Sequence, residues 1–183
     1  IKLIQGHQNM KVVKLAKPFS GSFSEIERFA SELRETANKK IKASSTKEML
    51  NKVTSFYGGR IEVADAPTPF EEDGGSLIIN TRNDFIIHLS PFTSPFRDNF
   101  TVAHELGHYF LHYVYAKETG RMEFTRYGSG PVEWQANRFA AAFLMPEQEF
   151  KRIMKKYVDD LSSVAAHFQV SKPAVKVRSE YIR

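Results

Sequence analysis

Two histidines and a glutamate near the middle of the chain are the residues best suited to chemistry. They lie in His104-Glu105-Leu106-Gly107-His108, which has the pattern H-E-x-x-H. In an α-helix the two histidines are about 40° apart around the axis and about 6 Å apart along it, so both imidazoles can reach one metal ion. Glu105 is about 100° round from His104, beside the ion, where it can take a proton from water. The pattern therefore predicts metal-assisted hydrolysis.

A third metal ligand is needed, because a catalytic zinc ion usually has three protein ligands and one open position. His112 continues the four-residue spacing, but on an unbroken helix it is about 12 Å along the axis from His104. That span is too long for one ion, so we expect His112 to be structural or to support a ligand. Glu133 is the better candidate, because a hairpin of two helices can bring the start of the next long helix over the first.

Four other residues are candidates for supporting roles. Asn137 shares a helix face with Glu133 and could accept a hydrogen bond from the outer nitrogen of a ligand histidine, although simple packing between helices fits it equally. His88, Arg126 and Tyr127 are candidates for binding the oxyanion, because they lie in a strand or loop expected to border the cleft. An ordinary polar surface position also fits each of these three.

The composition is that of one catalytic domain with small additions. The chain has 183 residues, 42% of them hydrophobic, and no cysteine, which excludes disulfides, a thiolate nucleophile and a cysteine-based zinc site. It has no segment resembling a signal peptide and no apolar run that could span a bilayer, so we expect a cytoplasmic protein with no membrane partner. We divide it into an N-terminal segment (1–22), a catalytic domain (23–157) and a C-terminal helical pair (158–183). Part of the first segment could be foreign to the native chain, with Met10 as a candidate native start.

Charge changes sign along the chain. Residues 1–60 have 12 Lys and Arg against 5 Asp and Glu (+7), residues 61–150 have 6 against 13 (−7), and residues 151–183 have 8 against 3 (+5). An acidic middle suits a domain that holds a cation. The basic flanks could meet an acidic partner or a phosphate backbone, although solvated lysine-rich helix faces explain them as well.

Hydrophobic spacing predicts an α+β fold in which helices pack on a small, mainly antiparallel three-stranded sheet. The expected strands are 60–64, 76–79 and 85–89. The expected helices begin at Ser22 or Ser24 (to about 42), 46 (to 57), Ser94 or Asp98 (through the motif), 131 (to 144), 147 (to 157), 160 (to 168) and 171 (to 182), with a loop over 117–130. Whichever of 76–80 and 85–90 is the edge strand could pair with an extended substrate.

Four segments around the motif form a recognisable set: Phe100–His112, Glu133–Asn137, Phe139–Ala141 and Leu144–Pro146. Together they strongly resemble the ImmA/IrrE family of zinc metallopeptidases. The resemblance implies a minimal zincin-like domain with one zinc ion per chain, the gluzincin-type ligands His104, His108 and Glu133, and Glu105 as catalytic acid and base. It also implies a bacterial or phage setting and a protein substrate, often a repressor-type regulator encoded nearby.

The C-terminal residues Val164–Val175 are similar to a helix-turn-helix, although Gln169 replaces the usual glycine of the turn. Lys172, Lys176 and Arg178 could touch phosphate. We favour a helical pair that packs on the catalytic domain or holds a protein substrate. A zinc-dependent endopeptidase is thus the main hypothesis. The alternatives are a DNA-binding regulator with a structural zinc site and an antitoxin-like or chaperone-like binder with a vestigial one.

Overall fold

A four-stranded mixed sheet forms the base of this α+β fold. The computed structural model describes residues 16–63, 75–125, 130–158 and 160–182. Its strands lie in the order β1-β3-β2-β4; β3 is parallel to β1, and the other two pairings are antiparallel. The strands are β1 (Gly59–Val63), β2 (Ser76–Thr81), β3 (Asp84–Leu89) and β4 (Met122–Thr125). The sheet thus has four strands and not the expected three. Strand β4 lies in the segment expected to be a loop, and its four residues are too few to show a hydrophobic period.

Both internal positions of the sheet are taken by β2 and β3, and the edges are β1 and β4. The prediction that 76–80 or 85–90 pairs with a substrate as an edge strand is therefore wrong. The main-chain groups of β2 and β3 are used by neighbouring strands on both sides. Of the two edges, β4 is the one beside the motif helix, since the Phe124 ring stacks on the His108 ring at 4.6 Å between centroids.

The predicted helices are all present in the described part of the chain, with ends within two residues of the expected positions. The motif helix differs, because after α3 it continues as a π-helix, η1, that starts at the second motif histidine. The bounds are α1 (Phe23–Lys40), α2 (Thr46–Phe56), α3 (Pro95–Gly107), η1 (His108–Val114), α4 (Pro131–Leu144), α5 (Glu147–Lys156), α6 (Leu161–Phe168) and α7 (Lys172–Tyr181).

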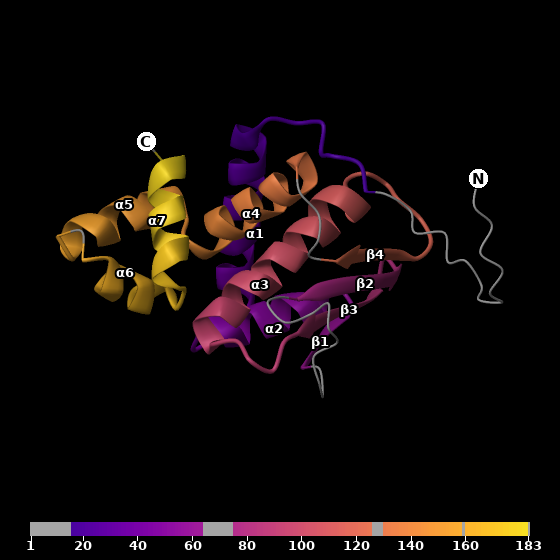
Figure 1. Cartoon of the computed structure of the whole chain (residues 1–183), viewed down its shortest axis with the longest axis horizontal. Helices are drawn as coiled ribbons and strands as arrows, with labels where there is room; N and C mark the ends of the chain where they lie inside the picture. Colours follow the sequence, from indigo (N-terminus) through magenta and orange to yellow (C-terminus); the bar gives the residue numbers. More distant parts are fainter. Residues whose placement is uncertain (1–15, 64–74, 126–129, 159, 183) are drawn as a thin grey trace, which may run out of the picture.

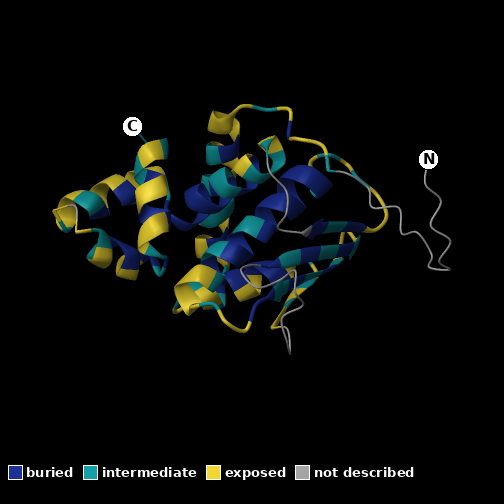
Figure 2. Ribbon diagram, in the orientation of Figure 1, coloured by how far each residue is buried: buried dark blue, intermediate teal, exposed yellow. Residues whose placement is uncertain are grey.

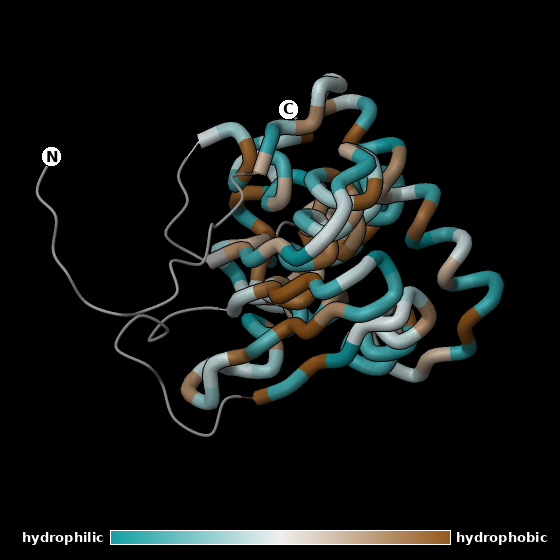
Figure 3. Tube along the Cα trace, turned by 90° about the vertical axis from the view of Figure 1, so that its right-hand side faces the viewer, coloured by the Kyte–Doolittle hydropathy of each residue, from teal (hydrophilic) through white to brown (hydrophobic). Residues whose placement is uncertain are grey.

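Helices cover one face of the sheet in layers (Figure 1). Burial alternates along β3, so that Phe85, Ile87 and Leu89 face the helices. Helix α3 and η1 lie on this face, α4 crosses α3, and α1 packs on α4. Buried residues are concentrated where these helices meet, whereas α5, α6 and α7 form a group at one end with an exposed outer side (Figure 2). Hydrophobic residues accordingly gather in the middle of the chain trace (Figure 3).

Local signals set where the two central helices begin. Ser94 is the N-cap of α3 and its hydroxyl accepts from the Arg97 N–H, with Pro95 in the first turn. Helix α4 starts at Pro131 after Gly130, whose φ of 110° favours glycine. These two starts place His104 and His108 about three turns along one helix and Glu133 in the first turn of the other.

The C-terminal helices are docked by buried polar contacts. Arg178 on α7 is fully buried; its Nη1 donates to the Glu27 carboxylate of α1 at 2.6 and 2.8 Å, and its Nε donates to the Met145 carbonyl at 2.9 Å. The expectation that Arg178 could touch phosphate is wrong for this reason. Gln169 takes the left-handed conformation of the missing glycine (φ 55°), and Thr46 N–H donates to its side-chain oxygen at 2.9 Å. No described helix is long and apolar enough to cross a membrane.

Candidate metal centre

The close crossing of α3 and α4 brings the predicted ligands together. Gly107, inside the motif, lies against Ala136; a Cβ at position 107 would be 3.1 Å from the Ala136 Cα and carbonyl oxygen. Any larger residue would push the helices apart. The glycine of H-E-L-G-H therefore lets α4 approach closely enough for Glu133, three residues before Ala136, to reach the two histidines.

His104, His108 and Glu133 point at one shared position. Their possible ligand atoms all lie within 4.8 Å of one another, and they are the one such group of three among the residues that the structure describes. His104 Nε2 is 3.0 Å from His108 Nε2, and the Glu133 oxygens are 3.2 and 3.3 Å from these two nitrogens. In a tetrahedral site with bonds of about 2.1 Å, neighbouring ligand atoms are about 3.4 Å apart. The spacing fits one small divalent ion.

The electrostatics of the three groups also fit a cation. Burial lowers the pKa of His108 to about 4, so this imidazole is neutral at pH 7. Burial also opposes the charge on Glu133, but its interactions with the His104 and His108 rings outweigh burial and hold the carboxyl pKa well below its ordinary value. At His104, burial is likewise outweighed, by Glu133 and by the charge of Glu105, and the pKa is raised. A bound metal would take the place of the His104 proton.

Asn137 on α4 contacts His104, one of the three predicted ligands. His104 Nδ1 lies 2.9 Å from Asn137 Oδ1. Since the amide oxygen only accepts, His104 Nδ1 carries a proton, and Nε2, which faces Glu133 and His108, is the nitrogen that a metal would bind. This is the usual tautomer of a histidine that binds zinc through Nε2.

His112 supports His108 and is separate from the ligand group. Its Nδ1 is 3.1 Å from His108 Nδ1, and its Nε2 is 3.1 Å from Gln135 Oε1. His112 is fully buried, and burial lowers its pKa to about 4. Sequence reasoning missed Gln135, because a residue two positions from Glu133 lies about 200° round an α-helix and should face away. The π-helix η1 changes where His112 lies, and no residue in Tyr109–Leu111 indicates that change.

Glu105 lies beside the metal position. Its side chain is only 3% exposed, and it is close enough to His104 for its charge to raise the pKa of that histidine. Across from it is Gly75, at the start of β2, where a Cβ would be 2.5 Å from the Thr101 methyl and 3.5 Å from Glu105 Oε1. A Cβ at Gly75 would also be 2.8 Å from the His88 carbonyl oxygen, so glycine lets the chain before β2 lie close to α3 and β3 next to Glu105.

Of the three oxyanion candidates, His88 lies among the residues that the structure describes. His88 lies on the face of β3 opposite to Phe85 and Ile87, and its Nε2 is 3.7 Å from Glu62 on the neighbouring strand. The sheet separates it from the metal position, so the expected oxyanion role of His88 is corrected to a contact with Glu62 on the other face. Arg126 and Tyr127 lie outside the described residues, and their role stays a prediction.

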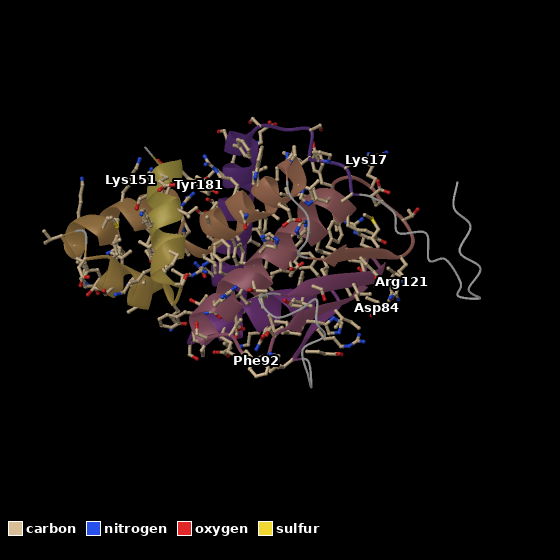
Figure 4. All side chains as sticks on the ribbon, viewed as in Figure 1. Lys17, Asp84, Phe92, Arg121, Lys151 and Tyr181 are labelled. Atoms are coloured by element: carbon tan, nitrogen blue, oxygen red, sulfur yellow. The ribbon has the colours of Figure 1, made fainter. Side chains whose placement is uncertain are left out.

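A cleft of about 500 Å³ lies between α3, α4 and α7. Thr101 of α3 and Asn137 of α4, which contacts His104, line one side, and Pro173, Val177 and Tyr181 of α7 line the other. Tyr181, which is labelled in Figure 4, also covers the guanidinium of Arg138 on α4 at 4.3 Å. Helix α7 thus forms one side of a cleft whose other side is formed by α3 and α4.

Residues 62–180 match the family of peptidases described as the IrrE N-terminal-like domain. The chain belongs to this family. The match covers the motif helix, α4 and the C-terminal helices, and it confirms the resemblance seen in the sequence. No curated protein matches the sequence.

A solved structure supports the fold. A Mycobacterium tuberculosis transcriptional regulator superposes with a TM-score of 0.59 at 16% sequence identity, over 82% of this chain and 45% of that protein. At this identity the likeness concerns the fold alone. The chain spans less than half the length of that regulator.

Proposed function

We propose that this member of the peptidase family is a zinc-dependent endopeptidase. His104, His108 and Glu133 would hold one zinc ion per chain, and Glu105 would be the catalytic acid and base. The observation that carries the proposal is the convergence of two imidazole nitrogens and a carboxylate at 3.0 to 3.3 Å, with a buried Glu105 beside them. Two histidines and a carboxylate are also a common donor set of zinc hydrolases.

Bound zinc would supply Lewis-acid chemistry at this position, making water more acidic and polarising a carbonyl group. Glu105 would take one proton from the attacking water while the water oxygen forms a bond to the carbonyl carbon. The same carboxyl would then deliver that proton to the amide nitrogen as the C–N bond breaks, so that an acid and an amine leave. Asn137 would hold the His104 ring in its orientation throughout.

The surroundings of the site suit an extended protein segment as substrate. Edge strand β4 lies against His108 through Phe124, and an extended chain could pair with its outer side. The cleft between α3 and α7 could take a side chain of the same substrate, with Phe100, Pro173 and Val177 as apolar walls. A repressor-type regulator encoded nearby is the substrate we propose, and the bacterial or phage setting and the cytoplasmic location are part of the same proposal.

Co-expression of the chain with the proteins encoded beside it tests this function. We expect one of these proteins to be cleaved by the wild-type chain, and the product to disappear on zinc chelation and with Glu105→Gln. A neighbouring protein that stays intact in every case would refute the proposal. A product that persists with Glu105→Gln would show that a different site or enzyme makes the cut.

DNA binding is a second candidate function, favoured by one observation. Gln169 gives the turn between α6 and α7 the left-handed residue of a helix-turn-helix, and Lys172 and Lys176 are exposed one turn apart on α7. Duplex DNA binding that weakens steeply with salt would support it. An antitoxin-like role with a vestigial site would instead leave the effect on the partner unchanged in Glu105→Gln.

A further inference from the structure

The buried chain of hydrogen bonds behind His108 reaches a part of the protein outside the family match. It runs from His108 through His112 and Gln135 to the backbone of Phe19, in the segment before α1. Phe19 precedes the matched residues 62–180 by more than forty positions. Since Phe19, His112 and Gln135 are at most 9% exposed, water does not compete for these bonds.

The Phe19 backbone determines how the Gln135 amide is turned. Phe19 N–H lies 2.8 Å from Gln135 Oε1, and the Phe19 carbonyl lies 2.8 Å from Gln135 Nε2. A backbone N–H can only donate and a carbonyl can only accept. The amide oxygen must therefore face the Phe19 N–H, and this is the atom that also meets His112.

The Gln135 oxygen in turn determines the proton positions on both histidines. Because Oε1 only accepts, His112 Nε2 must carry a proton and donate to it across 3.1 Å. In a neutral imidazole the other nitrogen is then bare, so His112 Nδ1 accepts from His108 Nδ1 across 3.1 Å. His108 Nε2 is left without a proton, and it is the atom that faces Glu133 and His104.

We propose that Phe19 and Gln135 are positioning groups of the metal centre, which fix through His112 the tautomer in which His108 offers Nε2 to the metal. At His104 a single hydrogen bond, from Nδ1 to Asn137 on α4, likewise leaves Nε2 as the nitrogen that faces the metal position. Helix α4 thereby supplies one ligand and the acceptors that orient the other two. The proposal rests on the proposed function only in that the site holds a metal.

The tautomers can be measured directly by long-range ¹H–¹⁵N NMR of the full chain, with His112→Gln used to assign signals. We expect His112 to be protonated on Nε2 with a bare Nδ1, both in the zinc-free and in the zinc-loaded protein. In the zinc-loaded protein His108 should carry its proton on Nδ1. A His112 protonated on Nδ1 would overturn the proposal, whether or not the chain cleaves any protein.

Zinc affinity, measured by competition with a chromophoric chelator, tests the coupling. Gln135→Leu should raise the zinc dissociation constant about tenfold, as groups that orient metal ligands commonly do. The matched control is Gln148→Leu, an exposed glutamine on α5, which should leave the constant unchanged. An unchanged constant in a folded Gln135→Leu protein would refute the positioning role.

A double-mutant cycle separates this role from a general structural one. Deleting residues 1–20 removes both Phe19 backbone groups and should by itself weaken zinc binding several-fold. Combined with Gln135→Leu it should weaken binding little further, because both changes interrupt the same chain of bonds. Full additivity of the two effects would contradict the proposal. If the deletion prevents folding, as seen by near-ultraviolet circular dichroism, the His112 tautomer of the wild-type chain still decides.

Discussion

The helix pair around the metal position and the C-terminal helices both bury charged side chains, but they arrange them differently. On α3, η1 and α4, the polar atoms of His104, His108 and Glu133 converge on one point. On α7, Arg178 closes directly on Glu27 and on the Met145 carbonyl. Convergent buried groups are suited to holding a ligand, whereas groups that close on one another hold elements together. The comparison separates chemistry from assembly within one small fold.

The largest expected effect is a loss of catalysis without a loss of zinc binding. Glu105→Gln should reduce cleavage of the neighbouring substrate protein by about 10²- to 10⁴-fold, since it removes a general acid and base. Zinc affinity should change little, because Glu105 lies beside the ligand group and is not part of it. Cleavage assays and zinc titration of the same preparation measure both quantities. Loss of zinc binding in this variant would mean that Glu105 is itself a ligand.

The next effect concerns assembly alone. Arg178→Met should lower the free energy of unfolding by about 3 kcal/mol, because it leaves the Glu27 carboxylate with a weaker set of partners. Glu27 keeps Arg138, whose Nε lies 2.7 Å away, so complete unfolding is not expected. Urea denaturation measures the loss, and zinc stoichiometry is the control. A stable Arg178→Met protein that no longer binds zinc would contradict the separate roles of the metal centre and the C-terminal helices.

The pH dependence of the zinc-free protein should come mainly from the metal centre. The pKa values of His108 and His112 are lowered to about 4 by burial, against an ordinary value of 6.5. Between pH 4 and pH 6.5 the unfolded chain binds more protons than the folded chain does. The free energy of unfolding therefore decreases as the pH falls through this range. We expect each of the two histidines to contribute a loss on the order of 2 kcal/mol between pH 7 and pH 5, measured by urea denaturation.

His112→Asn serves as the control for this pH effect, because it removes one of the two histidines and should flatten the dependence by about half. The raised pKa of His104 acts in the opposite direction, above pH 6.5. A wild-type stability that rises on going from pH 7 to pH 5 would contradict the assignment of two neutral buried histidines.

The smallest effect tests the helix crossing that brings the two halves of the site together. Gly107→Ala places a methyl group 3.1 Å from the Ala136 backbone and should lower the free energy of unfolding by about 1 kcal/mol. Helix propensity alone predicts the opposite sign, a gain of about 1 kcal/mol. Thermal or urea unfolding therefore decides by sign. Zinc affinity should fall as well, because Glu133 moves away with α4.

Much of the fold followed from short-range signals. Helix periods and caps such as Ser94-Pro95 and Gly130-Pro131 set the helix ends, and the α+β class is confirmed. The ligand geometry followed from the helical repeat, since histidines four apart share a face and Glu133 begins the next long helix. These features depend on neighbours a few residues away, which is why the sequence alone was sufficient.

The features that were missed depend on distant partners. Gln135 matters because it meets Phe19, which is 116 positions away, and Arg178 is buried because of Glu27, which is 151 positions away. The π-helix after His108 and the four-residue strand β4 leave no periodic signal. Such features need the packed structure, and Gln135, the π-helix and β4 all lie at or beside the metal position.

Zinc titration of the metal-free chain by isothermal calorimetry measures whether His104, His108 and Glu133 hold a metal ion. The wild-type chain should bind one zinc ion, Glu105→Gln should bind it with similar affinity, and Glu133→Ala should lose most of the affinity. Each expectation follows from the group of His104, His108 and Glu133. A chain that binds no zinc, or that binds it equally well with Glu133→Ala, would contradict the account.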